Sequence, residues 1–513
     1  VADAIASAVV ARTGRGVAAL QMRSLDELAR AIVNDAGEFP RVASEMERRL
    51  AMRMAARAVG DGLMDGRGVA SMLERSYRDL RDSGLTLAEI SPRGLRHPRR
   101  TQTILRAFAE YERVIARLGA IDPADLLANA TRLVTRATLR PQLLAGFYDM
   151  TGAQLRFVES LMGFASEIFV PTDLPFAQSF LSRVQRSTVN VERPAAPAEN
   201  VISFETRHDE LRAICAEIAS LLRSGVREIG ITARSLDPYD VRLINRFAAE
   251  HGFRTSLGDE VPLTAHRIGR GIVTLLRIRE RGFPRAEVLE LVRDGLHTRT
   301  RIDADRSDYE TRRARIAGGT SAELAPMRNG SRAIEEYVDL VAELEELTSS
   351  LDVDRLGGLF RVETQQDLRA AEQLDEIAAV FRRAGATHDW PSVIDALEQA
   401  SLPCERRADN GALVWLGDVM RFRGRTFSHL FAIRMQDDVF PQRRVEDPLF
   451  PDSDRRILGM REIGDGTEEE RLLLQLVRDS AAHVHYSFAI GDGFGKVLRG
   501  SRFVRNVVER RAL

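Results

Sequence analysis

The sequence predicts an α/β protein with two discontinuous domains, each built on a parallel sheet and interrupted by a block of helices. Two observations support this. Residues 201–251 read as strand, helix, strand and helix, a run that implies a parallel sheet with right-handed crossovers. Residues 25–118 and 268–404 place apolar residues at spacings of three and four, which is typical of amphipathic helices.

Composition narrows the class of protein. The chain has 513 residues, of which 44% are hydrophobic, 29% charged and 6% aromatic, and this length exceeds what one hydrophobic core supports. The net charge of −1 excludes a polycation. Cys215 and Cys404 are the only cysteines, so neither a disulfide framework nor a zinc site is expected. No apolar run approaches the roughly 18 residues of a membrane span, and we expect a cytoplasmic protein without a membrane partner.

The first half predicts one of the two α/β domains, formed by residues 1–35 and 119–186. It would hold an Ala-rich helix at 2–12, strands at 16–22, 142–148 and 167–172, and a helix that begins in "IDPADLL". Residues 36–118 are the predicted helical insert. A Pro/Gly loop at 91–100 interrupts this insert and carries four arginines, Arg93, Arg96, Arg99 and Arg100.

The second half repeats this plan. Residues 187–199 contain two prolines and no apolar period, which predicts a linker. The second α/β domain would combine residues 200–267 and 405–500 around a helical insert at 268–404. Residues 501–513 would be a tail that leads to a domain outside this chain.

Residues 414–441 resemble the fifth motif of superfamily 1 helicases of the UvrD/RecB kind. That motif runs V-x-L-x-T-x-H-x-x-K-G-x-E-F, then an apolar strand, Gly-Leu-acid-acid and Phe-Pro. It aligns without a gap, and the matches are Val414, Leu416, Gly424, Phe427, Phe431, Ile433, Met435, Phe440 and Pro441. Arg423 takes the place of the lysine before the glycine.

Three further segments resemble the same family, in the same order along the chain. "EEERLLLQLVRDSAAHVHYSF" at 468–488 is similar to the sixth motif. "EIGITARSLDPYDVRLINRFAAEHGFRTSL" at 228–257 is similar to the fourth-motif region, with Arg234 on its arginine and Gly252 on its glycine. "IDPADLL" is similar to the family's D-F-D-D-L-L through Asp125, Leu126 and Leu127. The resemblance covers most of the chain and implies two RecA-like domains.

The departures from the family pattern concern ATP hydrolysis, which needs a phosphate-binding loop, acids for magnesium and water, and arginines that meet the transition-state charge. Gly146 and Phe147 stand where the acids belong, and Asp149 has the wrong offset. Asp479 occupies the finger-like arginine position, with Arg478 one place early. Arg234, Asp149 and Arg478 are therefore read as relics of nucleotide binding. For Arg234 the alternative is a residue that caps a strand end.

The only lysine is Lys496, so arginine supplies 73 of the 74 basic residues. Lys496 lies in "GDGFGKVLRG", but a phosphate-binding loop would need glycine at 490 and Ser or Thr at 497, where Ile490 and Val497 stand. We interpret this segment as a turn after the last strand. The chain thus predicts no cofactor, and ATP with magnesium only if a phosphate-binding loop lies upstream of residue 1.

The chain resembles the inactivated helicase-like halves of the AddB, RecC and AdnA type, found in bacterial proteins that carry a C-terminal PD-(D/E)XK nuclease. The phrase "GFYDMTGAQLRFVESL" at 146–161 carries this second resemblance. The nuclease itself would lie outside the chain, since "EDPLFPDSDRR" at 446–456 supplies acids and no lysine. We interpret that stretch as a loop after Phe-Pro.

The resemblance implies that the basic turn at 421–425 faces nucleic acid and nucleotide at the carboxyl edge of a sheet. Arg423 is the first expected phosphate contact, with Arg421 and Arg425 beside it, and Arg99 and Arg100 form a second group. The alternative for both groups is a solvated, charged loop.

Three functions follow as hypotheses. The first is a non-catalytic scaffold that binds single-stranded or branched DNA and serves a nuclease domain in the same chain or a partner helicase–nuclease subunit in DNA double-strand-break repair and recombination. The second is an ATP-dependent helicase or exonuclease subunit whose phosphate-binding loop lies upstream of residue 1. The third is a protein-interaction platform without DNA contact.

Overall fold

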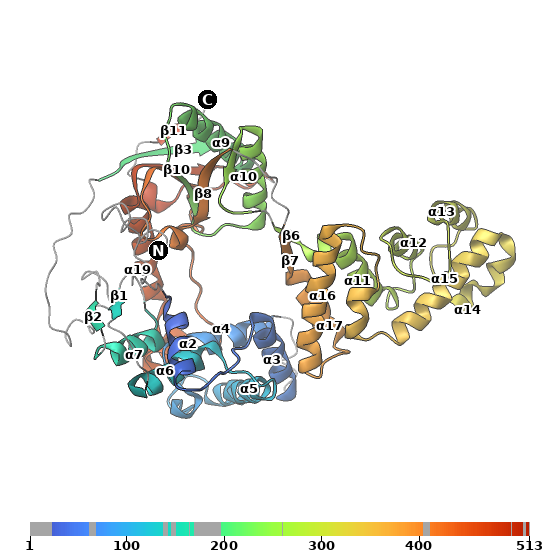
Figure 1. The fold of residues 1–513 in the computed structure, drawn as a ribbon, viewed down its shortest axis with the longest axis horizontal. Helices are drawn as coiled ribbons and strands as arrows, with labels where there is room; N and C mark the ends of the chain where they lie inside the picture. Colours follow the sequence, from blue (N-terminus) through green and yellow to red (C-terminus); the bar gives the residue numbers. More distant parts are fainter. Residues whose placement is uncertain are drawn as a thin grey trace. The chain divides into compact units, whose positions relative to one another are not determined.

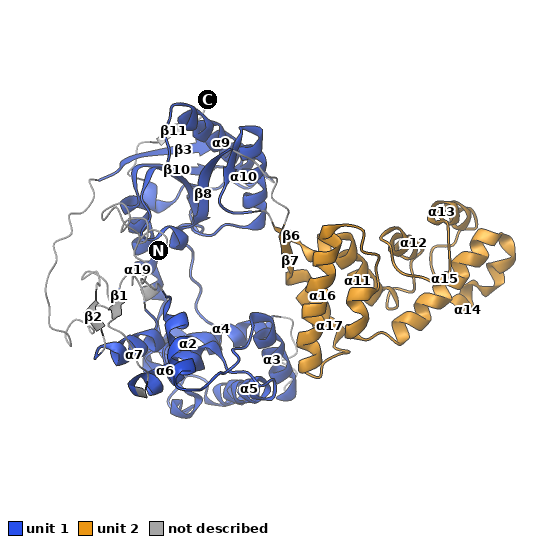
Figure 2. Cartoon of the chain, viewed as in Figure 1, with its two compact units in different colours: residues 1–258, 406–513 blue, residues 259–405 orange. Residues whose placement is uncertain are grey.

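The computed structural model describes residues 23–60, 68–136, 142–144, 150–163, 165–168, 196–258, 260–403, 411–493, 495–505 and 509–511. The chain forms two compact units, residues 1–258 with 406–513 and residues 259–405 (Figure 2). The helix predicted at 2–12, the strand predicted at 16–22 and most of the predicted linker lie outside the described residues.

A seven-stranded sheet lies in the first unit (Figure 1). The strand order is β11-β3-β10-β9-β4-β8-β5, and every neighbouring pair is parallel. The strands are β3 (Ala198–Phe204), β4 (Ile229–Ala233), β5 (Phe253–Thr255), β8 (Ala412–Asp418), β9 (Phe427–Ala432), β10 (Ala481–Ala489) and β11 (Glu509–Arg511). The predicted α/β class with a parallel sheet is confirmed.

Helices cover both faces of this sheet. On one face α9 (Arg207–Arg223) and α10 (Pro238–Glu250) pack through Ile218 and Phe247 against strand residues such as Ile231. On the other face α19 (Ile463–Asp479) and the 3-10 helix η7 (Val419–Phe422) pack against β9 and β10. Since all five residues of β4 are buried, this strand has the continuous apolar character of a sheet covered on both sides.

Local signals fix where α9 and α10 begin. The Thr206 hydroxyl accepts from the Asp209 amide at 3.2 Å, and the Asp237 carboxylate accepts from the Asp240 amide at 2.8 Å. Pro238 is the first residue of α10, where its missing N–H is not needed. Both helices follow strands directly, so their first turns lie at the carboxyl edge of the sheet.

The early part of the chain is mainly helical. Its core joins residues from helices and β1, including Ile32, Leu127 and Phe157. Strand β1 (Gln142–Leu144) pairs with β2 (Ala165–Ile168) in parallel. The helices are α2 (Leu25–Asp35), α3 (Glu45–Ala58), α4 (Val69–Asp82), α5 (Pro98–Arg117), α6 (Pro123–Leu133) and α7 (Gly152–Leu161). A complete RecA-like domain at 1–35 and 119–186 stays a prediction.

The described residues of the second unit are mainly helical, and they include the antiparallel pair β6 (Glu260–Pro262) and β7 (Ser401–Pro403). Its helices are α11 (Arg267–Ile278), α12 (Arg285–Arg293), α13 (Ala304–Arg313), α14 (Ser321–Leu324), α15 (Arg332–Ser349), α16 (Gln365–Arg383) and α17 (Trp390–Gln399). Over all described parts of the chain, none of the helices combines the length and apolarity that a membrane crossing requires.

The segment predicted as a loop at 446–456 is partly helical, so that prediction was wrong. Helix α18 (Asp452–Leu458) begins inside it and ends at Gly459, which adopts a left-handed conformation with φ of 69°. The segment also has a buried core residue, Phe450, whose ring lies 6.5 Å from that of Phe108 in α5. Because Phe450 is buried, the stretch is packed against α5 rather than solvated.

Candidate functional site

Four charged residues meet at the carboxyl edge of the seven-stranded sheet. Arg207 opens α9, Asp237 and Asp240 open α10, and Arg434 follows β9. Arg434 Nη1 lies 3.0 Å from Asp240 Oδ2 and 3.4 Å from Asp237 Oδ2, and Arg207 also pairs with both acids. We call these four residues the carboxyl-edge cluster. Its two cations are neutralised by its two anions.

Arg434 stands at the second glycine of the fifth motif, the one in Gly-Leu-acid-acid, and its φ of 59° is in the left-handed region. This conformation is costly for a residue with a side chain. Its backbone amide donates to Glu210 Oε1 at 2.9 Å, and its guanidinium binds the two aspartates. Arg434 was not among the predicted site residues, although an arginine in place of that glycine was a visible signal.

A buried carboxyl group lies beneath the carboxyl-edge cluster. Glu210 in α9 is fully buried and accepts from Ser487 Oγ at 2.6 Å and from the Arg434 amide. Burial raises the pKa of the Glu210 carboxyl above its usual value. Its second oxygen has no hydrogen-bond partner among the described residues. Glu210 therefore links α9, β10 and the turn after β9.

Arg234, the predicted relic of phosphate contact, is held inside the unit by an acid. Its Nε lies 2.8 Å and 3.1 Å from the two oxygens of Glu470 in α19, and the Glu470 side chain is only 1% exposed. The Gln442 amide donates to the same carboxylate at 3.0 Å. The pair thus connects the segment similar to the fourth motif with the segment similar to the sixth.

Arg478, the second predicted relic, lies elsewhere. Its Nε is 2.8 Å from Glu199 Oε1, which also accepts from the Tyr486 hydroxyl at 2.6 Å. Glu199 is near the amino end of β3, so Arg478 and Arg234 are not brought together. Asp149 lies outside the described residues.

The basic turn does not lie as a whole at the carboxyl edge, so this part of the prediction was wrong. Strands β8 and β9 are both parallel to β4, and parallel strands cannot be joined by a hairpin. Residues 419–426 must therefore cross from the carboxyl end of β8 to the amino end of β9. The Ser428 amide bonds to the Glu228 carbonyl just before β4, which places Arg425 near the amino end.

Each arginine of this turn has a different environment. Arg421 is exposed and follows β8 closely, and its amide donates to Asp418 Oδ1 at 3.0 Å. The Nε of Arg423, which is half-buried, donates to the Met420 carbonyl at 3.1 Å. The Arg425 guanidinium lies over the Trp415 ring, 3.7 Å from its centroid. Arg421 is the most accessible of the three.

Arg99 and Arg100 belong to the first turn of α5 and are exposed. Arg100 donates to the carbonyls of Pro448 and Leu449, the latter at 3.1 Å. The Arg96 amide in turn donates to Asp454 Oδ1 at 2.8 Å. Part of this arginine group therefore fastens the segment 446–458 rather than standing free.

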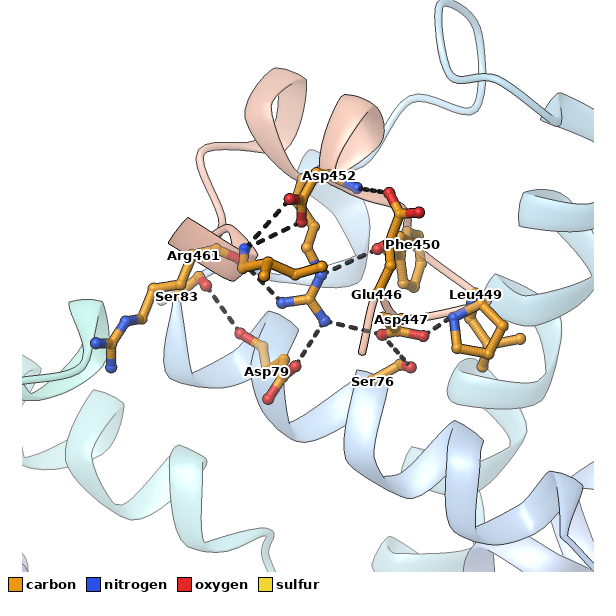
Figure 3. A network of polar contacts seen from close by, with 12 residues as sticks. Ser76, Asp79, Ser83, Glu446, Asp447, Leu449, Phe450, Asp452 and Arg461 are labelled. Atoms are coloured by element: carbon orange, nitrogen blue, oxygen red, sulfur yellow. Dashed lines mark hydrogen bonds and ion pairs between the residues drawn. The ribbon is translucent and has the colours of Figure 1, made fainter. Parts of the chain in front are cut away.

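A network around Arg455 completes this attachment, and the sequence did not predict it (Figure 3). The Arg455 guanidinium lies 2.6 Å from Asp79 in α4 and 2.8 Å from Asp447, and Asp447 accepts from Ser76 Oγ at 2.7 Å. Arg455 also donates to the carbonyls of Phe450 and Arg461 at 3.0 Å. Several of these partners lie far apart in sequence, so no local pattern identifies them.

Three histidines stack on the face of the sheet that α9 and α10 cover. His429 in β9 lies against His483 and His485 in β10, with ring centroids 4.6 Å and 5.2 Å away. His429 Nδ1 is 2.9 Å from His485 Nε2. Burial, and then the two neighbouring histidines, lower the pKa of His485 to about 4. In the described parts of the chain, no group of His, Cys, Asp and Glu is arranged to hold a metal ion.

Comparison with known proteins gives a partial match. No family model matches the chain. A stretch of 101 residues is 29% identical to an ATP-dependent helicase/deoxyribonuclease subunit of Clostridium botulinum strain Hall, and it covers 18% of this chain and 9% of that protein. The same protein from strains Langeland and Okra matches with the same identity and coverage. The similarity relates part of the chain to helicase–nuclease proteins, and the match spans less than a tenth of those relatives.

Proposed function

We propose that this chain is a helicase-like DNA-binding scaffold without ATP hydrolysis of its own, which serves a helicase–nuclease system in DNA double-strand-break repair. The pairing of Arg234 with Glu470 carries the proposal. Arg234 matches the arginine expected near a nucleotide, and its Nε already contacts both oxygens of a buried carboxylate. A phosphate that took this arginine would leave the buried Glu470 carboxylate with only the more distant Arg444, 3.9 Å away, as a counter-charge, which is unfavourable.

Two features of the sequence support the absence of hydrolysis. Gly146 and Phe147 replace the acids that would hold magnesium and orient water. Asp479 places a negative charge where an arginine would stabilise the transferred phosphoryl group. The carboxyl-edge cluster adds to this, because its two arginines are engaged by Asp237 and Asp240.

The proposed partners are DNA, a nuclease domain and a helicase–nuclease subunit. The relatives are named helicase/deoxyribonuclease subunits, which supports a role beside such an enzyme. With a net charge of −1, affinity for DNA must come from local groups of arginines rather than from the overall field. We place the nuclease, of the PD-(D/E)XK type, outside this chain, and the complex in the cytoplasm.

The first experiment measures ATP turnover by the purified protein with and without single-stranded DNA. The scaffold predicts a rate equal to the no-enzyme control in both conditions. DNA-stimulated turnover would instead favour the alternative function, an ATP-dependent helicase or exonuclease subunit with its phosphate-binding loop upstream of residue 1.

The second experiment measures DNA affinity as a function of salt. Contacts to phosphates release counterions, so the affinity for single-stranded or branched DNA should fall linearly on logarithmic axes. Arg423→Ala should reduce the slope by about 0.7, the value for one contact to a single strand. A wild-type protein that binds neither kind of DNA would contradict the scaffold and favour a protein-interaction platform.

A further inference from the structure

The chain forms an ordered turn after β10, at the carboxyl edge of the sheet. The amides of Ile490 and Gly491 donate to the carbonyls of Phe204 and Glu205 at the end of β3. The chain then reverses, and the Leu498 amide donates to the Ile490 carbonyl at 2.7 Å. Gly493 and Gly495 adopt positive φ values of 82° and 96°, a conformation that glycine accepts readily.

Four cations follow this reversal at intervals of three residues. Lys496, Arg499, Arg502 and Arg505 are all exposed. Within the described residues, the side chains of Lys496, Arg499 and Arg502 make no ion pair, and the Arg502 guanidinium lies 6.0 Å from the centroid of the Phe503 ring. We call Lys496, Arg499 and Arg502 the post-strand cations. They differ from Arg207, Arg234 and Arg434 at the same edge, whose charges are neutralised by acids.

Backbone contacts hold this segment against the turn that follows β9. The Asp437 amide donates to the Arg499 carbonyl at 2.9 Å, and the Ser501 amide donates to the Met435 carbonyl at 2.8 Å. Ser501 is fully buried, and its hydroxyl donates to the Phe440 carbonyl. The post-strand cations therefore extend from a fixed backbone, which lowers the entropy lost when they bind a ligand.

Two acids contact the segment, and its cations outnumber them. The Asp437 carboxylate accepts from the Arg502 amide at 3.0 Å and lies 3.3 Å from Arg505. Asp492 accepts from the Lys496 amide at 3.0 Å. Asp437 and Asp492 are thus both tied to the segment's own backbone, and the side-chain ion pair of Asp437 is with Arg505 rather than with a post-strand cation.

We propose that the post-strand cations bind phosphate groups of a nucleic-acid backbone. The location supports this, because ligands of open parallel sheets bind outside the carboxyl ends of the strands. Exposed cations that no described acid neutralises provide sequence-independent contacts to phosphates. This inference rests on the proposed DNA-binding function and names a surface that the basic turn at 421–425 does not include.

The test compares two triple variants in a salt titration with single-stranded DNA. The first combines Lys496→Gln, Arg499→Gln and Arg502→Gln. The control combines Arg30→Gln, Arg301→Gln and Arg313→Gln, which removes the same charge from exposed positions elsewhere. The first variant should lose affinity on the order of tenfold or more at low salt, with a slope lower by about 2, and the control should match wild type. Circular dichroism checks that both variants fold.

A second measurement uses the single lysine and needs no variant. Amine-reactive labelling of Lys496, read by peptide mass spectrometry, should drop at least severalfold when single-stranded DNA is bound. Inorganic phosphate at the same phosphate concentration should leave the labelling unchanged, and protection by both would overturn the inference in favour of a site for free anions.

The outcomes separate this inference from the proposed function. Wild-type binding with an unaffected first variant and unprotected Lys496 would overturn the inference alone. Equal losses in both triple variants would also overturn it, because net charge would then be the cause. A wild-type protein that binds no DNA would overturn the proposed function together with the inference.

Discussion

The guanidinium of Arg455 lies 2.6 Å from the carboxylate of Asp79, 376 positions earlier in the sequence. This ion pair joins helix α18 to helix α4 (Figure 3). Arg455 is 9% exposed and makes further hydrogen bonds to Asp447 and to the carbonyls of Phe450 and Arg461. A segment between the fifth and sixth motif-like regions is thereby fixed to the helices of the early chain.

Replacement of Arg455 should strongly destabilise the protein. Arg455→Met leaves Asp447, whose side chain is 11% exposed, without its counter-charge, and the loss of a buried partner costs up to about 3–5 kcal/mol. Asp79 is 39% exposed, so the loss of its pair adds little. The measurement is the free energy of unfolding from denaturant titration. Arg456→Met is the control, because Arg456 is exposed and pairs with Glu462 at the surface, where a loss of at most about 1 kcal/mol is expected. Equal losses in both variants would contradict the role given to Arg455.

The Arg455 network shows which features of the fold the sequence could predict and which it could not. The strand–helix–strand–helix run predicted at 201–251 is confirmed as β3, α9, β4 and α10, because an apolar run and a 3.6-residue period are local features. The partners of Arg455 come from α4 and from residues 447–461. No periodicity selects such partners, and the sequence alone therefore predicts a loop for this segment.

Glu470 should contribute to stability through Arg234. Glu470→Gln keeps the shape but removes the charge opposite a largely buried guanidinium, so we expect a loss of about 1–3 kcal/mol in the free energy of unfolding. Glu469→Gln is the matched control, since Glu469 pairs with Arg444 in a more exposed setting and should cost less than about 1 kcal/mol. If Glu469→Gln proved the more harmful variant, the assignment of the Arg234 partner would be wrong.

The site residues were harder to predict than the elements that carry them. Arg234 directly follows β4, and its role as a relic of nucleotide binding stays a prediction. Its partner Glu470 lies in α19 and follows from the packing of that helix. The predicted position of the basic turn rested on the expectation that functional residues of a parallel sheet lie at its carboxyl edge. Because β8, β4 and β9 are parallel, the connection from β8 to β9 must cross the sheet, and the basic turn does not stay at the carboxyl edge.

The histidine stack should make stability fall in acid. The folded protein lowers the pKa of His485 from 6.5 to about 4, so the unfolded chain binds a proton at a higher pH than the folded one. The stabilising contribution is therefore complete above pH 6.5 and declines as the pH falls towards 4. His485→Phe, which can stack on Phe431 without titrating, should flatten this part of the profile.

The control for the histidine stack is His251→Gln, because His251 is exposed and does not belong to the stack. The free energy of unfolding is measured between about pH 4 and pH 8 for wild type and both variants. Carboxylates titrate in the same range, so the difference between each variant and wild type is the informative quantity. A His485→Phe profile parallel to that of wild type would show that His485 does not cause the loss.

The last prediction separates two arginines of the basic turn. Arg425 lies over the Trp415 ring near the amino end of the sheet, so Arg425→Ala should lower the free energy of unfolding by about 0.5–1 kcal/mol. The salt dependence of DNA binding should not change, because this side chain packs against the sheet. Arg421 is exposed beside the carboxyl end of β8, so Arg421→Ala should leave stability unchanged and reduce the salt slope by about 0.7. Denaturant titration and a DNA salt titration on both variants provide the comparison. A reduced slope in Arg425→Ala with an unchanged slope in Arg421→Ala would show that DNA approaches the amino end of the sheet.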